Sequence, residues 1–123
     1  MMTVNLSVSN SVVRMKEDCI FCKIANGVIP TDFVYENEFV AAFKDINPKA
    51  STHILVIPKA HYDSLNEVDD EKILLELFKA VKEVAKKLNL DSYRTVINTG
   101  KGAGQEVFHI HIHILSGKVL PKF

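Results

Sequence analysis

Residues 107–115 read Val-Phe-His-Ile-His-Ile-His-Ile-Leu, with an imidazole at every second position and an apolar residue beside each. Side chains on a β-strand point to opposite faces with a period of two, so His109, His111 and His113 share one face of a predicted strand. A helix would scatter these imidazoles around its axis. The opposite face is expected to be core and carries Phe108, Ile110, Ile112 and Ile114.

The composition is that of one soluble domain. The chain has 123 residues, 47% of them hydrophobic, and 15 basic residues balance 15 acidic ones. This length suits a single domain with one core. Without a basic cluster, binding to a nucleic-acid backbone has no obvious source, and no apolar run approaches the roughly 20 residues that span a bilayer. We therefore expect neither nucleic acid nor a membrane as a partner.

The rest of the chain predicts a single α+β unit. Apolar residues recur every three or four positions between residues 73 and 88, with acidic residues before them and lysines at the end, which is typical of a long amphipathic helix. Strands arranged around one long helix imply an antiparallel sheet with helices on one side. The other predicted elements are a short helix at 19–26, an extended segment at 30–35 and strands at 39–43, 54–57 and 95–98.

The first 18 residues mix polar and apolar side chains and lack a continuous apolar core. They do not resemble a secretory signal, so we expect a flexible N-terminal extension at 1–18, one domain at 19–123 and a cytoplasmic location. In that reducing compartment, a disulfide between Cys19 and Cys22 is disfavoured. The pair could instead bind zinc, form a redox couple or remain as two buried thiols.

Three imidazoles on one face can attack, transfer protons or bind phosphate, because their reference pKa of about 6.5 lies near neutrality. A catalytic zinc is an alternative. However, His109 and His113 would stand roughly 13 Å apart along a straight strand, too far for both to reach one ion. We therefore expect the three histidines to have different chemical roles.

The run at 109–114 matches the His-φ-His-φ-His-φ signature of the histidine triad (HIT) family, where φ is apolar. The chain most resembles the Hint branch, the histidine triad nucleotide-binding proteins. The resemblance implies the HIT fold, a five-stranded antiparallel sheet with two helices, paired as a homodimer through the long helix and a neighbouring strand. Further family landmarks, in the same order, lie at 19–24, 43–48, 52–61 and 104–108.

The resemblance also implies covalent catalysis. In the family the middle histidine, here His111, attacks the α-phosphorus of a nucleoside monophosphate ester or amide. The backbone carbonyl of His109 would hold its other ring nitrogen. His53 and His113 would cradle the phosphoryl oxygens and shuttle protons. The implied catalytic set is His53, Gln105, His111 and His113.

Nucleotide and metal contacts follow from the same resemblance. Asp45, which by itself reads as a turn residue, would accept hydrogen bonds from the ribose hydroxyls, and Asn98 and Gln105 would direct their amides toward the phosphate. The apolar slot for a purine base would comprise Phe21, Phe43, Ile46 and Val107. Metal-bearing members of the family suggest a structural zinc and no organic cofactor, with the ligands Cys19, Cys22, His61 and His109.

The implied activity is hydrolysis of purine nucleoside phosphoramidates and of acyl- or aminoacyl-adenylates to the nucleoside monophosphate. Two alternatives stay open: a dinucleoside polyphosphate hydrolase, and a non-catalytic purine-nucleotide-binding scaffold protein. The sequence Leu-Ser-Gly-Lys at 115–118 resembles the Hint ending more than that of the polyphosphate hydrolases. Glu106 departs from the serine of many animal Hint proteins and resembles bacterial members.

Overall fold

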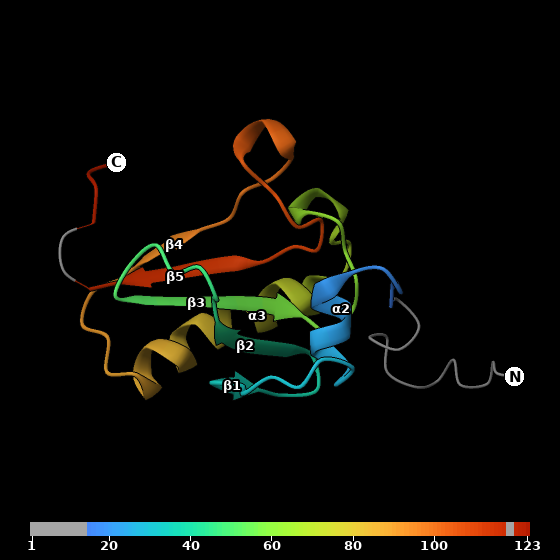
Figure 1. Cartoon of the computed structure of the whole chain (residues 1–123), viewed down its shortest axis with the longest axis horizontal. Coiled ribbons are helices and arrows are strands. Elements are labelled where there is room, and N and C mark those ends of the chain that lie inside the picture. Colours follow the sequence, from blue (N-terminus) through green and yellow to red (C-terminus); the bar gives the residue numbers. More distant parts are fainter. Residues whose placement is uncertain (1–14, 118–119) are drawn as a thin grey trace, which may run out of the picture.

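The structure, a computed structural model, describes residues 15–117 and 120–123, and in these residues five strands form one sheet (Figure 1). Its strands lie in the order β1-β2-β3-β5-β4, and each neighbouring pair is antiparallel. The predicted five-stranded antiparallel sheet is therefore confirmed. The strands are β1 (Tyr35–Glu36), β2 (Val40–Lys44), β3 (Thr52–Pro58), β4 (Arg94–Val96) and β5 (Ile112–Ser116).

The long helix α3 spans Glu71–Lys87 and confirms the prediction from periodicity. The Asp70 side chain caps it by accepting a hydrogen bond from the Lys72 amide at 2.9 Å. Lysines occupy its last turn, where the helix dipole favours positive charge. Both ends of the helix are therefore specified by local sequence.

The short helix α2 spans Ile20–Ala25, as predicted, with Cys19 as its N-cap. The Cys19 sulfur accepts a hydrogen bond from the Cys22 amide at 3.3 Å. Gly27 follows the helix with φ of 77°, a left-handed conformation that glycine adopts without steric cost. Two short 3-10 turns, η2 (Leu65–Glu67) and η3 (Lys101–Ala103), complete the elements of the described residues.

One face of the sheet packs against α3. The helix contributes Leu77 and Val84, each at most 1% exposed, and a fully buried side chain of this kind stabilises the fold by about 1.5–3 kcal/mol. The buried strand residues on this face are Val40, Ala42, Ile54, Val56, Ile112 and Ile114.

The opposite face of the sheet packs against α2, so the two helices lie on different sides (Figure 1). Phe21 and Ile24 of α2 pack with Phe43 and Leu55 in this second core. The expectation that both helices lie on one side is wrong, because even a helix of six residues carries enough apolar surface to cover part of a second face. The uncovered part of that face holds the candidate site.

The histidine-rich stretch is a strand only in its second half. β5 begins at Ile112, and the Ile110 amide donates to the carbonyl of Tyr62 at 2.8 Å instead of to a strand. The alternation still holds, because Ile110, Ile112 and Ile114 are all buried in the core under α3. Phe108 is 44% exposed, so the prediction that it joins this core is wrong.

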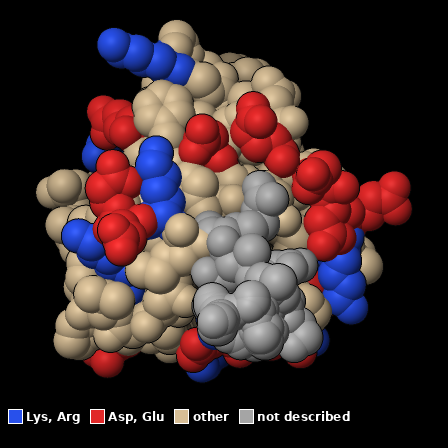
Figure 2. All heavy atoms as spheres, turned by 90° about the vertical axis from the view of Figure 1, so that its right-hand side faces the viewer, with Lys and Arg blue, Asp and Glu red and all other residues tan. Residues whose placement is uncertain are grey.

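Other expectations concern the surface and the chain ends. Most of the predicted extension at 1–18 lies outside the described residues, although Met15 packs against the α2 core. Among the described residues, no helix is long and apolar enough to span a bilayer. Figure 2 shows acidic and basic side chains interspersed over one face of the molecule, without a broad basic patch in its described part.

Candidate active site

A pocket opens on the face of the sheet that carries α2 and encloses about 760 Å³. This volume lies within the range of about 300–1,000 Å³ that is usual for small-molecule sites. Residues from α2, from the four strands β2 to β5 and from the loop before β5 line it. Its titratable wall includes Asp45, His53, Glu106, His111 and His113.

The imidazole of His111 is held in one orientation. Its Nδ1–H donates to the carbonyl oxygen of His109 at 2.8 Å, which leaves the Nε2 lone pair free. The Phe21 ring lies edge-on to it, with centroids 5.2 Å apart. Burial lowers the pKa of His111 below its usual value, so the ring is neutral at neutral pH. A buried, oriented and neutral imidazole is well suited to act as a nucleophile.

His53 and His113 form a directed pair. The Lys49 backbone N–H donates to His53 Nδ1 at 3.0 Å, which places the His53 proton on Nε2. His53 Nε2 lies 2.9 Å from His113 Nδ1 and therefore donates to it. The proton of neutral His113 is then on Nε2. Burial, with His111 and His53 nearby, lowers the pKa of His113 to about 4, so this ring too is neutral at neutral pH.

The Nε2 atom of His113 is the single buried side-chain nitrogen or oxygen without a hydrogen-bond partner among the described residues. Such an atom costs free energy unless something binds it. The side chain lines the pocket, so this N–H is placed to donate to an anionic ligand there.

Asp45 lies at the end of β2 and serves two purposes. One carboxylate oxygen accepts the Asn47 amide at 2.8 Å, which is the turn role expected from the sequence. The other lies 3.4 Å from His53 Nε2, and the side chain is 18% exposed and lines the pocket. Turn formation and ligand binding are therefore compatible in this residue.

The side chains predicted for the base slot all reach the pocket. Phe21 and Phe43 pack edge to face with centroids 5.7 Å apart, and Val107 lies nearby in the same core. Ile46 lines the pocket while 90% exposed, so it stands at the pocket mouth. Asn98 is also part of the wall.

Gln105 does not direct its amide into the pocket. Its Oε1 accepts the Gly100 amide at 2.8 Å, and its Nε2 donates to the carbonyls of Asp63 at 2.6 Å and Val107 at 3.1 Å. The side chain is 3% exposed, and its hydrogen bonds all go to backbone groups. It therefore holds the glycine-containing loop in place, and the expectation that it faces the phosphate does not match this geometry.

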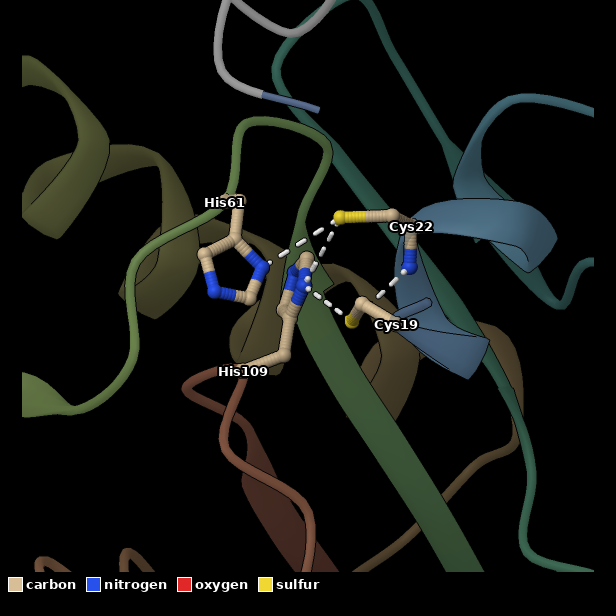
Figure 3. A group of neighbouring side chains, drawn as sticks. All are labelled: Cys19, Cys22, His61 and His109. Carbon is tan, nitrogen blue, oxygen red and sulfur yellow. Dashed lines mark hydrogen bonds between the residues drawn. The ribbon is translucent and has the colours of Figure 1, made fainter. Parts of the chain in front are cut away.

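A second cluster of titratable side chains lies at the start of α2, where Cys19, Cys22, His61 and His109 converge (Figure 3). Their candidate ligand atoms all lie within 4.8 Å of one another. His109 Nδ1 is 3.3 Å from the Cys19 sulfur, and His61 Nδ1 is 3.3 Å from the Cys22 sulfur. Burial raises the pKa of Cys22 to about 11 and lowers that of His109 to about 4 in the metal-free chain.

The hydrogen bonds on the outer side of these two imidazoles fit a metal site. His61 Nε2–H donates to the Asp63 carboxylate at 2.7 Å, and His109 Nε2–H donates to the Pro58 carbonyl at 2.8 Å. Both rings therefore turn the Nδ1 lone pair toward the thiols, the arrangement that metal-bound histidines show. Two sulfurs and two imidazole nitrogens are a usual donor set for structural zinc.

Asp45, His53 and His113 also bring three possible ligand atoms within 4.8 Å of one another, but their hydrogen bonds oppose metal binding. A metal on His53 Nε2 would move the ring proton to Nδ1, where it would meet the Lys49 N–H. Two donors would then face each other. The geometry thus favours the Cys₂His₂ cluster for a metal and a hydrogen-bond network for the pocket.

The sequence did not reveal several contributors to these sites. The Lys49 amide and the Pro58 carbonyl are backbone groups, and residue identity carries no signal for them. Asp63 stands two residues after His61, a spacing that could have suggested a carboxylate partner for the imidazole. Glu106 was noted for its departure from serine, and it lines the pocket as an exposed side chain.

Comparison with known sequences gives independent evidence on the family of this chain. A family model described as the HIT domain matches residues 26–120. Protein HitA of Neisseria gonorrhoeae is 50% identical over 106 residues, which cover 84% of this chain and 99% of HitA. The purine nucleoside phosphoramidase of Escherichia coli is 41% identical over 110 residues, which cover 86% of this chain and 92% of that enzyme.

Solved structures agree with the sequence relatives. A histidine triad protein from Clostridium difficile superposes with a TM-score of 0.83 at 48% identity, covering 88% of this chain and 97% of that one. A HIT family hydrolase from Legionella pneumophila gives a TM-score of 0.80 at 42% identity, with 85% and 96% covered.

Proposed function

The chain belongs to the HIT family, and from that premise we propose that it hydrolyses purine nucleoside phosphoramidates and acyl- or aminoacyl-adenylates. The relative from Escherichia coli, which bears the name purine nucleoside phosphoramidase, supports this substrate class. The pocket of about 760 Å³ has room for a nucleoside monophosphate together with a leaving group. Within the family, we assign the chain to the Hint branch.

The proposed reaction has two steps. His111 Nε2 attacks the α-phosphorus and the bond from phosphorus to the leaving group breaks. An amine leaves after taking up a proton from water, and an acyl group leaves as its carboxylate. Water then attacks the phosphorus of the nucleotidyl-histidine, which frees His111 and releases the nucleoside monophosphate. Hydrogen bonds to the phosphoryl oxygens, which carry the charge in the transition state, are each worth roughly 10²- to 10³-fold in rate.

The observation that carries this proposal is the 2.8 Å hydrogen bond from His111 Nδ1 to the His109 carbonyl. It presents the Nε2 lone pair of a neutral imidazole in the pocket that also holds the unpartnered N–H of His113. Asp45 at the same wall supplies carboxylate oxygens for ribose hydroxyls. Phe21, Phe43, Ile46 and Val107 supply the apolar surface for a base.

A side-by-side assay tests the function. Adenosine phosphoramidate and a dinucleoside polyphosphate are offered to the wild type and to His111→Ala, with and without a chelator. We expect the wild type to cleave the phosphoramidate faster. Preference for the polyphosphate would indicate the alternative hydrolase, and AMP binding without cleavage of either substrate would indicate a scaffold protein. Loss of activity on chelation from protein that remains folded would instead support a catalytic metal.

We further propose that the cluster of Cys19, Cys22, His61 and His109 holds a structural zinc ion. Bound there, the metal would supply a cross-link between the start of α2, the loop after β3 and the segment before β5 (Figure 3). The outer hydrogen bonds to Asp63 and Pro58 support this assignment.

We also propose that the chain forms a homodimer through α3 and a neighbouring strand. Leu75 and Phe78 lie three residues apart on α3 and are 55% and 48% exposed. Adjacent exposed apolar side chains on a helix often mark a protein interface. This pair faces away from the core that α3 shares with the sheet.

A further inference from the structure

The hydrogen bonds around His53 run in one direction from the backbone to the pocket. A backbone N–H can only donate, so the Lys49 amide requires a lone pair on His53 Nδ1, 3.0 Å away. The contact of the other ring nitrogen, Nε2, independently indicates the same tautomer. His53 Nε2 faces an Asp45 carboxylate oxygen at 3.4 Å, and a carboxylate accepts hydrogen bonds. Both neighbours therefore place the proton of neutral His53 on Nε2.

This tautomer of His53 determines that of His113. The 2.9 Å contact between His53 Nε2 and His113 Nδ1 then has its donor on His53, so Nδ1 of His113 must accept. The remaining proton of a neutral His113 is on Nε2. That nitrogen is the buried atom without a partner.

We infer that this relay, from the Lys49 amide through His53, fixes His113 as a hydrogen-bond donor to a phosphoryl oxygen, and that His53 is a positioning residue. His53 has both ring nitrogens engaged by protein groups, whereas His113 has one free N–H. This division of roles differs from the expectation that both imidazoles cradle the phosphate. The direction of the relay is a property of the protein alone, whereas its use on phosphate rests on the proposed function.

Nitrogen-15 NMR of the histidine rings in the wild-type protein tests the relay directly. Long-range couplings distinguish a protonated ring nitrogen from one with a lone pair. We expect His53 and His113 to carry the proton on Nε2, and His111 to carry it on Nδ1. A proton on Nδ1 of either His53 or His113 would overturn the proposal. The result does not depend on turnover, so an inactive protein would contradict the proposed function without affecting this measurement.

A matched pair of variants tests the role of His53. In His53→Gln the side-chain amide can still donate to His113 Nδ1, whereas the nearly isosteric His53→Glu can only accept when ionised. We expect the proton of His113 to stay on Nε2 in the Gln variant and to move to Nδ1 in the Glu variant. The kcat of His53→Glu should be lower by about 10²-fold than that of His53→Gln, with a smaller difference in KM. Unchanged His113 spectra in both variants would refute the relay.

The Lys49 amide and the phosphate contact are tested separately. Lys49→Pro removes the N–H, and Lys49→Ala keeps it, so only the proline variant should mix the tautomers of His53. Addition of AMP to the wild type should shift the Nε2 signal of His113 more than that of His53. The reverse order of shifts would make His53 the phosphate ligand and overturn the assignment.

Discussion

At the scale of single residues, the candidate chemistry depends on which ring nitrogen of each histidine carries the proton. Backbone carbonyls orient His109 and His111, and a backbone amide orients His53. Each of these partners can only donate or only accept, so the tautomers follow from geometry. Chemically identical side chains can therefore serve as nucleophile, hydrogen-bond donor to phosphate, positioning residue and metal ligand.

Replacement of His111 by alanine tests the nucleophile. We expect His111→Ala to lower kcat by about 10⁴-fold or more, because no other imidazole presents a free lone pair to the pocket in the described residues. Affinity for AMP should change only a few-fold, since the ribose and phosphate contacts remain. Calorimetric titration with AMP and a single-turnover assay separate these effects, and substantial turnover by a pure preparation would disprove the assignment.

Sequence reasoning captured the side chains of the site better than their backbone partners. The alternation at 107–115 located the histidine face, and family likeness selected Asp45 and the aromatic pair that the structure places in the pocket. It misjudged Gln105, since nothing in an amide side chain shows whether its partner will be a ligand or a loop. Backbone donors such as the Lys49 amide become visible only once the chain is folded.

At the scale of elements, α2 is the helix whose stability depends most on tertiary contacts. Helices this short are not stable alone, so α2 depends on tertiary contacts. Phe21 and Ile24 provide apolar contacts, and the sulfurs of Cys19 and Cys22 meet imidazoles from two distant segments. The sequence predicted that this helix exists, but its place on the far side of the sheet depends on long-range packing that periodicity does not encode.

Metal analysis tests the anchoring of α2. We expect about one zinc ion per chain, and chelation should lower the free energy of unfolding more than it lowers kcat. Asp63→Ala should weaken zinc binding by about 10- to 100-fold, because it removes the acceptor that orients His61. The exposed Asp91→Ala serves as the matched control. A metal-free protein of undiminished stability would refute the structural site.

The end of β5 depends on a glycine. Gly117 has φ of 132°, and a Cβ there would lie 2.5 Å from the Cβ of Ser51. We expect Gly117→Ala to lower the free energy of unfolding by about 1–3 kcal/mol, as measured by urea denaturation. Gly102→Ala, where an added Cβ meets nothing within 4 Å, should have a much smaller effect. Equal effects of the two substitutions would contradict this explanation.

At the scale of the whole molecule, the sheet separates structural and chemical roles. The α3 side holds the larger apolar core, and the α2 side holds the pocket and the Cys₂His₂ cluster. The five-stranded antiparallel sheet agrees with the expectation from the sequence, but the strand order, with β5 between β3 and β4, was not predicted, because side-chain alternation does not identify the neighbours of a strand. The proposed association with a second chain would use the outer surface of α3, away from both cores.

Light scattering coupled to size exclusion tests the dimer. The wild type should elute as a dimer, and Phe78→Asp should shift it toward the monomer without loss of helix content, because a charge would enter an apolar interface. Val28→Asp makes the same type of change at another exposed apolar side chain and should leave the dimer intact. A monomeric wild type would overturn the proposed interface.

The buried imidazoles predict acid sensitivity. His109 and His113 have pKa values of about 4 when folded, below the reference value of about 6.5, mainly because of burial. The unfolded chain therefore binds more protons, and the stability present above about pH 6.5 is lost as the pH falls toward 4. Denaturation of metal-free protein should show a loss of up to about 3 kcal/mol per pH unit within this window. A flat profile there would contradict the burial of these rings.

The pairing of β5 with β3 restricts how this protein can vary in evolution. Isoleucine and histidine alternate along residues 109–114, and β5 forms the second half of this run. The removal or addition of a single residue within β5 would therefore exchange the side chains that face the α3 core with those that face the pocket. Gaps between homologous chains can accumulate in the loop before the strand and in the segment after it. Inside the strand, substitution is the only change that both the core and the chemistry can survive.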